Sequence, residues 1–177
     1  MDRKPESMTL GDDERRMIAL WAADCAERVL PLFEAKAASD ARPREAIVGV
    51  REFARGGKRT ARLRELVWAA YAAAREVGDP AAAAAARSAG LAAGMAYMHE
   101  SVTPDQTKHA FGPAAYAAQA RELAAAGDPG VADDEIEWAV QHASPAVREV
   151  VRRMPVRDCG RGRLDTLMYQ LGAGLRR

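Results

Sequence analysis

The sequence predicts an all-α protein on three observations. Apolar residues make up 49% of the 177, and nearly half of them are alanine, the best helix former because it loses no side-chain rotamer freedom on ordering. They recur every three or four residues, and no run alternates the β-branched and aromatic residues typical of strands. We expect a single domain of about seven or eight antiparallel helices. A repeated Gly-Asp-Pro tripeptide leaves stacked helical pairs open as an arrangement.

The chain begins with a polar segment, residues 1–8, that we expect to be a disordered tail. Thr9 is then a candidate N-cap, and acidic residues follow in the first turn, where the helix dipole favours them. The first helix is expected over about residues 10–37. Pro31 lies inside this helix and should kink it, because proline lacks a backbone donor.

Two shorter helices are expected next. Ser39 and Asp40 end the first helix and cap the second, which runs to about Arg55 before two glycines stop it. The third helix is expected over about residues 60–77, where apolar side chains share one face.

Asp79 followed by Pro80 is a strong start signal for a fourth helix, because aspartate caps a helix and proline is tolerated at its first position. We expect this helix to run to about Glu100. Gly90 and Gly94 lie four residues apart on one face of it, which indicates that another helix crosses closely there.

The remaining helices are expected over about residues 103–126, 133–143, 145–153 and 164–171. A Thr-x-x-Gln capping box starts the first of them, and Ser-Pro starts the third. We expect residues 127–130 to form a loop and the chain after residue 171 to fray. The helical domain is therefore expected to span residues 9–155, and residues 156–177 a Gly- and Arg-rich C-terminal extension with a short helix.

The net charge of +1 indicates neither nucleic acid nor a membrane as partner, but the charge is unevenly distributed. Residues 42–64 contain 8 basic and 2 acidic side chains, whereas residues 121–137 contain 1 basic and 6 acidic ones. These blocks either complement each other in the fold or form opposite faces. The basic stretch lacks interleaved aromatic residues and a DNA-binding motif, so we do not expect nucleic-acid binding.

The cysteines and the hydropathy pattern exclude some classes of protein. No apolar run reaches the roughly 18 residues of a membrane span, so we expect a cytoplasmic protein with no membrane partner. Cys25 and Cys159 have no zinc-ligand spacing, and we expect neither a metal nor a cofactor. Cys25, in an apolar helical stretch, is expected to behave as a small buried hydrophobe.

Several charged residues are candidates for a binding site. Asp24, Glu27 and Arg28 lie on one predicted helix beside its apolar stripe, and Asp24 and Arg28, four apart, can form an ion pair. His99 and His109 flank an expected turn and can approach each other. No nucleophile-elbow, Walker A or dinucleotide-binding motif is present, so we assign no catalytic residue and favour a protein that is not an enzyme.

Five segments carry a resemblance to a known family: Trp21–Glu34, 40–47, 87–99, 109–117 and Glu137-Trp138. Over about residues 10–155, the chain resembles the putative immunity proteins of bacterial polymorphic-toxin systems. The resemblance implies an all-helical fold and a cognate protein toxin as partner, and it supplies no catalytic residues. Pro113 interrupts a helix that usually reads through in this family, and the sequence after Arg157 matches nothing we recognise.

Three functions follow from these observations. The first is an immunity protein that binds and neutralises a toxin or another protein, with an acidic contact patch over residues 128–137 that includes Asp133, Asp134 and Glu135. The second is a helical protein that binds a small molecule in one pocket lined by aromatic residues. The residues expected to line that pocket are Trp21, Trp68, Tyr71, Tyr97, Tyr116 and Trp138.

The third and least favoured function is an enzyme in which Asp24, Glu27, His99 and His109 converge in one cleft with shifted pKa values. A homodimer is a further possibility for any of the three, and a large exposed Ala/Leu face would indicate one.

Overall fold

The computed structural model describes residues 7–177, and this part of the chain is an all-α fold, as predicted. Eight α-helices and one two-stranded sheet make up its regular structure, with two single-turn 3-10 helices, Met95–Tyr97 and Pro104–Gln106. The helices are α1 (Asp12–Glu34), α2 (Arg42–Ala54), α3 (Ala61–Glu76), α4 (Pro80–Gly94), α5 (Thr107–Ala124), α6 (Pro129–His142), α7 (Pro145–Arg153) and α8 (Arg163–Arg176).

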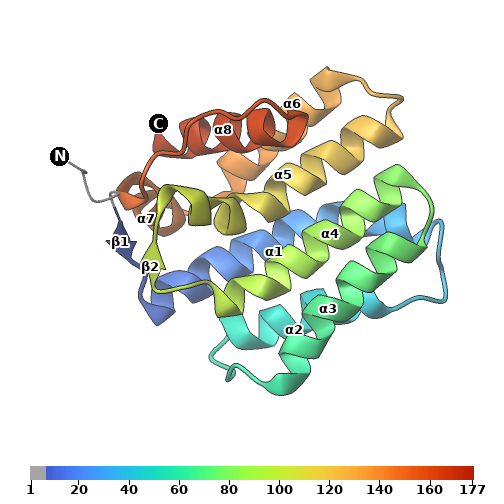
Figure 1. The fold of residues 1–177 in the computed structure, drawn as a ribbon, viewed down its shortest axis with the longest axis horizontal. Helices are drawn as coiled ribbons and strands as arrows, with labels where there is room; N and C mark the ends of the chain where they lie inside the picture. Colours follow the sequence, from blue (N-terminus) through green and yellow to red (C-terminus); the bar gives the residue numbers. More distant parts are fainter. Residues whose placement is uncertain (1–6) are drawn as a thin grey trace.

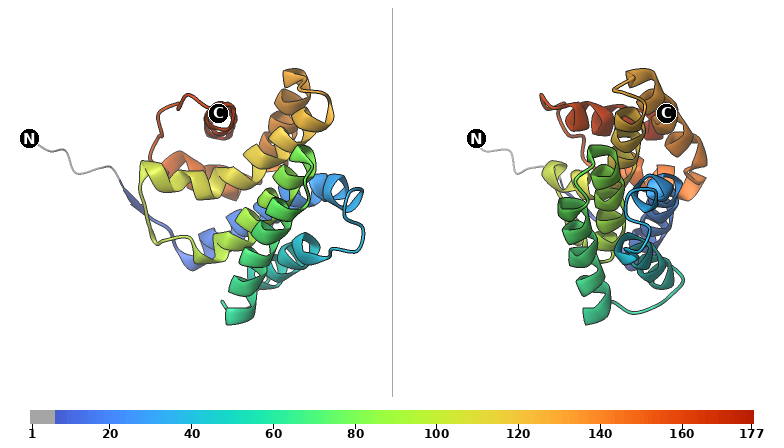
Figure 2. Two further views of the ribbon diagram at one scale, coloured as in Figure 1. Left: turned by 45° about the vertical axis from the view of Figure 1, so that its right-hand side comes forward. Right: turned by 90° about the vertical axis from the view of Figure 1, so that its right-hand side faces the viewer.

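Helices α1, α4 and α5 form the centre of the molecule (Figure 1). Helix α4 packs against α1, α3 and α5, and its alanines let the helix axes approach closely because they carry only a methyl group. Helices α2 and α3 cover one side of this centre, and α6 and α8 cover the other, as both views in Figure 2 confirm. Helices α6 and α8 therefore pack on α5, at the centre of the molecule.

The start of the chain differs from the prediction. The expected tail, residues 1–8, falls mostly outside the described residues, but Met8 and Thr9 form strand β1, which pairs antiparallel with β2 (Ser101–Val102). Thr9 is therefore not the N-cap of α1. Gly11 takes that position, and its backbone N–H donates to the Glu14 carboxylate at 3.0 Å. Strands of two residues are too short to show the alternation of apolar and polar side chains from which strands are predicted.

Helix α4 ends earlier than predicted, at Gly94 instead of about Glu100, because the chain must turn to reach β2. Gly90 meets the expectation of a close crossing, since a Cβ atom there would lie 3.1 Å from the Tyr71 ring of α3. Gly94 does not, since a Cβ atom there would lie 4.0 Å from Val67, which is ordinary contact. Of the two glycines, only Gly90 lies where an added Cβ atom would force a neighbouring side chain to shift.

Helix α6 begins at Pro129, within the segment predicted to be a loop. The Asp128 carboxylate accepts a hydrogen bond of 2.9 Å from the backbone N–H of Gly130, so it caps the helix. Asp79 does the same for α4 through the N–H of Ala82. The Asp-Pro pair is therefore the same start signal in both places, and the prediction applied it only to the first.

The C-terminal region contains a longer helix than expected. Helix α8 continues to Arg176, so the predicted fraying after residue 171 is wrong. Leu167, Leu171 and Leu175 are fully buried against α5, α6 and α7, and Gly174 lies close enough that a Cβ atom there would be 2.7 Å from Val140 of α6. This packing holds the last turn in place.

Two smaller expectations concern the burial of Cys25 and the presence of a membrane-spanning helix. Cys25 is 1% exposed within the core, as predicted, and burial raises the pKa of its thiol well above the ordinary value. None of the helices described between residues 7 and 177 combines the length with the apolar character that crossing a membrane requires.

Candidate functional site

Helix α6 carries the acidic residues that the sequence singled out, and an ion pair fixes it to α1. Arg28 of α1 donates two hydrogen bonds to the Glu135 carboxylate, from Nε to Oε1 at 2.7 Å and from Nη2 to Oε2 at 3.1 Å. Glu135 is only 4% exposed, and its hydrogen bond raises the pKa of the Arg28 guanidinium. The bidentate geometry holds α6 at a fixed orientation against α1.

A second set of polar contacts extends along the same face of α1. Asp24 forms an ion pair of 2.7 Å with the Arg51 guanidinium of α2. Its carboxylate also forms a hydrogen bond of 2.9 Å with Nε2 of His142 on α6. Arg51 also pairs with Glu27. These residues link three helices, so the expected Asp24–Arg28 pair is replaced by longer-range partners.

The Trp138 side chain completes this cluster. The Arg28 guanidinium lies 4.0 Å from the centre of the Trp138 ring, and the His142 imidazole stacks on that ring with centroids 4.5 Å apart and planes 15° apart. Together with Asp24 and Glu27, these three side chains line a shallow, open pocket of 320 Å³. Arg28 is paired with Glu135, and Asp24 and Glu27 are both paired with Arg51, so the cluster is suited to positioning α6 against α1 and α2.

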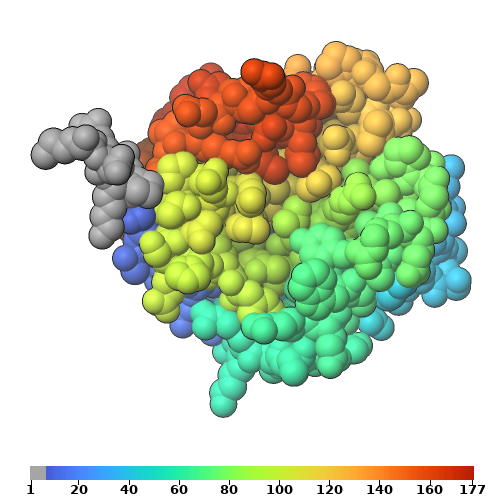
Figure 3. Space-filling model, in the orientation of Figure 1, coloured from blue at the N-terminus to red at the C-terminus, as the bar shows by residue number. Residues whose placement is uncertain are grey.

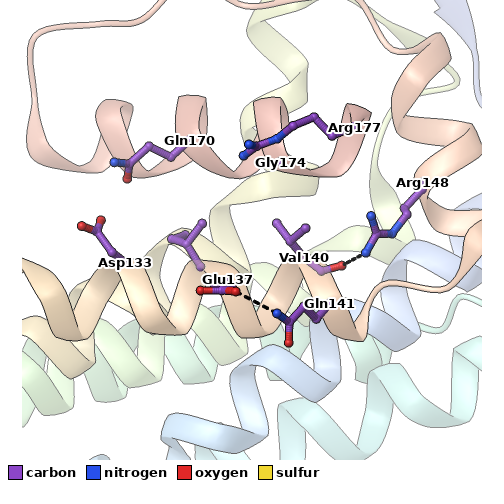
Figure 4. Close-up of a pocket in the computed structure, with 9 residues that line it drawn as sticks. Asp133, Glu137, Val140, Gln141, Arg148, Gln170, Gly174 and Arg177 are labelled. Carbon is purple, nitrogen blue, oxygen red and sulfur yellow. Dashed lines mark hydrogen bonds between the residues drawn. The ribbon is translucent and has the colours of Figure 1, made fainter.

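The opposite side of α6 forms a groove with α8. This groove has a volume of 610 Å³ and mixed polar and apolar walls. Figure 4 shows Asp133 and Glu137 on α6 and Gln170 on the facing helix α8. The Gln170 side-chain oxygen is buried and accepts no hydrogen bond within the described residues.

The C-terminal end of the groove is held by hydrogen bonds. Arg148 donates to the carbonyl oxygen of Val140 at 2.6 Å, and Gln141 donates to the Glu137 carboxylate at 2.8 Å (Figure 4). Arg148 thereby satisfies a carbonyl at the end of α6 that the helix itself leaves without a donor.

The three acidic residues expected to form a contact patch lie in two different environments. Asp133 and Asp134 are exposed and form no ion pair with any residue between 7 and 177. Glu135 points inward and is already bound by Arg28. Glu137, which the contact patch included only as part of its range, is exposed beside Asp133. The solvent-facing acidic group is therefore Asp133, Asp134 and Glu137, and we call it the α6 acidic face.

The structure does not bring the two candidate histidines together. His99 lines a pocket with Arg15, Arg59 and Arg64, and its Nδ1 accepts a hydrogen bond of 3.2 Å from the backbone N–H of Ser101. His109 lines a different pocket, and partial burial together with the positive charge of Lys108 lowers its pKa.

Asp24 and Glu27 line a third pocket, separate from those of the two histidines. The four groups required for the enzyme hypothesis therefore do not share a cleft.

The aromatic residues are also dispersed. Trp21 is buried and donates to the carbonyl oxygen of Ala139 at 2.9 Å, whereas Trp68 is 65% exposed. Tyr71 and Tyr116 line one pocket, whereas Tyr97 and Trp138 each line a different one. The six rings therefore do not enclose one ligand site, since helical periodicity assigns a face to each ring but does not determine which faces meet.

Sequence reasoning missed several residues of these surfaces, namely Arg51, Gln141, His142, Arg148 and Gln170. Trp138 and His142 lie four apart on one helix, as do Glu137 and Gln141, and this spacing was a local signal for His142 and Gln141. The contacts of Arg51 and Gln170 join separate helices, which local spacing does not reveal.

Comparison with known proteins identifies a family. A family model described as "Imm-5 like putative immunity protein" matches residues 8–146, which include α1 to α6 and the α6 acidic face. No curated protein and no solved structure matched the chain.

Proposed function

Because the chain belongs to the Imm-5 like putative immunity protein family, we propose that it binds and neutralises a cognate bacterial toxin in the cytoplasm. The family match, which covers more than half of the chain, is the observation that carries this proposal. Neutralisation would require a stable complex, and a dissociation constant in the nanomolar range corresponds to about −12 kcal/mol.

We propose the α6 acidic face as the part of the surface that contacts the toxin. Its carboxylates have no ion-pair partner within residues 7–177, so no intramolecular pair has to break before they meet a basic surface. Complementary charge of this kind accelerates encounter and favours one partner over others.

The anchoring of α6 supports the same assignment. The Arg28–Glu135 pair and the Trp138 stack fix the helix against α1 before any partner arrives. A preorganised contact surface loses less conformational entropy on binding than a mobile one. We thus expect the buried side of α6 to hold the helix in place and its exposed side to bind the toxin.

The test begins with the protein encoded next to this one in its genome. The two proteins are co-expressed, growth is measured, and affinity is determined by calorimetry with the full chain. We expect the neighbour to be toxic alone, harmless when co-expressed, and bound with a nanomolar dissociation constant. A neighbour that is harmless alone, or toxic but neither bound nor neutralised, would contradict the proposed function.

The contact surface is tested separately by charge reversal. The double variant Asp133→Lys/Asp134→Lys should weaken binding by at least about tenfold, and the affinity of the native protein should fall as salt rises. The matched control Glu52→Lys/Glu65→Lys reverses two exposed acids on α2 and α3 and should leave the affinity unchanged. If both variants bind the toxin with equal affinity, the contact surface lies elsewhere on the protein. The proposal that the protein binds a toxin would be unaffected.

A further inference from the structure

A pocket of 390 Å³ lies where α3, α4 and α5 meet the start of α8, apart from the α6 acidic face. Figure 3 shows this side of the molecule, with α8 above and α3 below the region in which these helices meet. A volume of this size is within the range of small-molecule sites, which is about 300–1,000 Å³.

The floor of the pocket is apolar, and two glycines make room for it. Tyr71 lies against the bare backbone of Gly90, where a Cβ atom would be 3.1 Å from the ring. Leu91 lies against Gly112, where a Cβ atom would be 2.9 Å from its Cδ1. Tyr116 also lines the pocket. The missing Cβ atoms let these side chains lie back against the helices, which leaves space above them.

The rim of the pocket is basic. Arg87 of α4 and Lys108 of α5 line it, and neither has an ion-pair partner in the described part of the chain. Arg157 lines it as well but is neutralised by Asp165 at 2.8 Å, the one carboxylate among the lining residues. Two cations therefore remain available beside an apolar floor. Burial raises the pKa of Tyr71 to about 12, so its phenol stays neutral and adds no negative charge.

We propose that this pocket binds a small amphipathic anion, with its apolar aromatic or acyl body on Tyr71, Leu91 and Tyr116 and its carboxylate or phosphate at Arg87 and Lys108. The apolar body gains from leaving water, and the anionic group gains charge-assisted hydrogen bonds. Two of the segments that carried the family resemblance, residues 87–99 and 109–117, both contribute lining residues, although they play no part in the α6 acidic face.

The test uses two pairs of probes that differ only in charge. 1-Naphthaleneacetate is compared with neutral 1-naphthaleneacetamide, and octanoate with octanamide, by isothermal titration calorimetry on the full chain. We expect at least one anion to bind at one site with a dissociation constant below about 1 mM and its amide to bind at least about tenfold more weakly.

Variants assign the binding to the pocket. Arg87→Gln/Lys108→Gln should weaken the anion at least tenfold, whereas the control Arg55→Gln/Arg75→Gln, which removes two exposed arginines outside the pocket, should not change its affinity. Absence of binding by both anions, equal binding of anion and amide, or full affinity in Arg87→Gln/Lys108→Gln would each overturn the proposal. Because no toxin is involved, this result is independent of the proposed function.

Discussion

The Glu135–Arg28 ion pair joins a buried carboxylate to a guanidinium that is about one-third exposed. The side chains of Glu135 and Arg28 are 4% and 36% accessible. Removing one member of such a pair leaves the other desolvated and without its partner, and that penalty is larger than the net gain from forming the pair. Asp134, the adjacent residue in the sequence, is exposed and forms no ion pair within residues 7–177. Neighbouring carboxylates in one acidic run thus have different energetic roles.

We predict that Glu135→Gln lowers the free energy of unfolding by about 1–3 kcal/mol, less than for a fully buried pair because water still reaches Arg28. Urea denaturation followed by circular dichroism measures this change. The control Asp134→Asn should stay within about 0.5 kcal/mol of the native protein. Similar losses in both variants would show that the ion pair does not stabilise α6 as we describe.

At the scale of single elements, the space around each glycine determines whether a Cβ atom would fit there. Gly90 and Gly94 share one face of α4, but only Gly90 lies against a neighbouring ring. Gly94 has φ −63° and ψ −20°, which alanine adopts easily. The sequence spacing identified the face, whereas the position of Tyr71 on α3 determines which of the two glycines is required.

We predict opposite signs for the two alanine substitutions. Gly94→Ala should stabilise the protein by up to about 1 kcal/mol, because alanine restricts the unfolded chain and favours the helix. Gly90→Ala should destabilise it by about 1 kcal/mol or more, because the added Cβ atom overpacks against Tyr71. Thermal and urea unfolding of the two single variants provide the comparison, and two changes of the same sign would contradict the packing argument.

For the whole molecule, α8 closes one side of the central helices. Its Leu167, Leu171 and Leu175 are fully buried, and each such side chain contributes about 1.5–3 kcal/mol by leaving water. A domain of this size is stable by only about 5–15 kcal/mol in total. The packing of α8 is therefore comparable with the stability of the entire fold, which leads us to propose that residues 156–177 belong to the domain.

We predict that a chain ending at Arg157 loses cooperative unfolding or aggregates when it is expressed. Circular dichroism melting and size-exclusion chromatography of the truncated and native proteins measure the effect. The control variant Leu167→Ala should remain folded but lose about 2–5 kcal/mol. A truncated protein that melts cooperatively within a few degrees of the native one would mean that residues 158–177 form a separable extension.

The sequence by itself determined the all-α class, most helix positions and the burial of Cys25, because alanine content, apolar spacing and caps act between residues only a few positions apart. The tertiary structure decided which candidate residues meet. His99 and His109 line different pockets, and Glu135 turns inward to Arg28 across more than a hundred residues. Local periodicity places a side chain on a helix face, whereas the packing of distant helices determines what that face contacts.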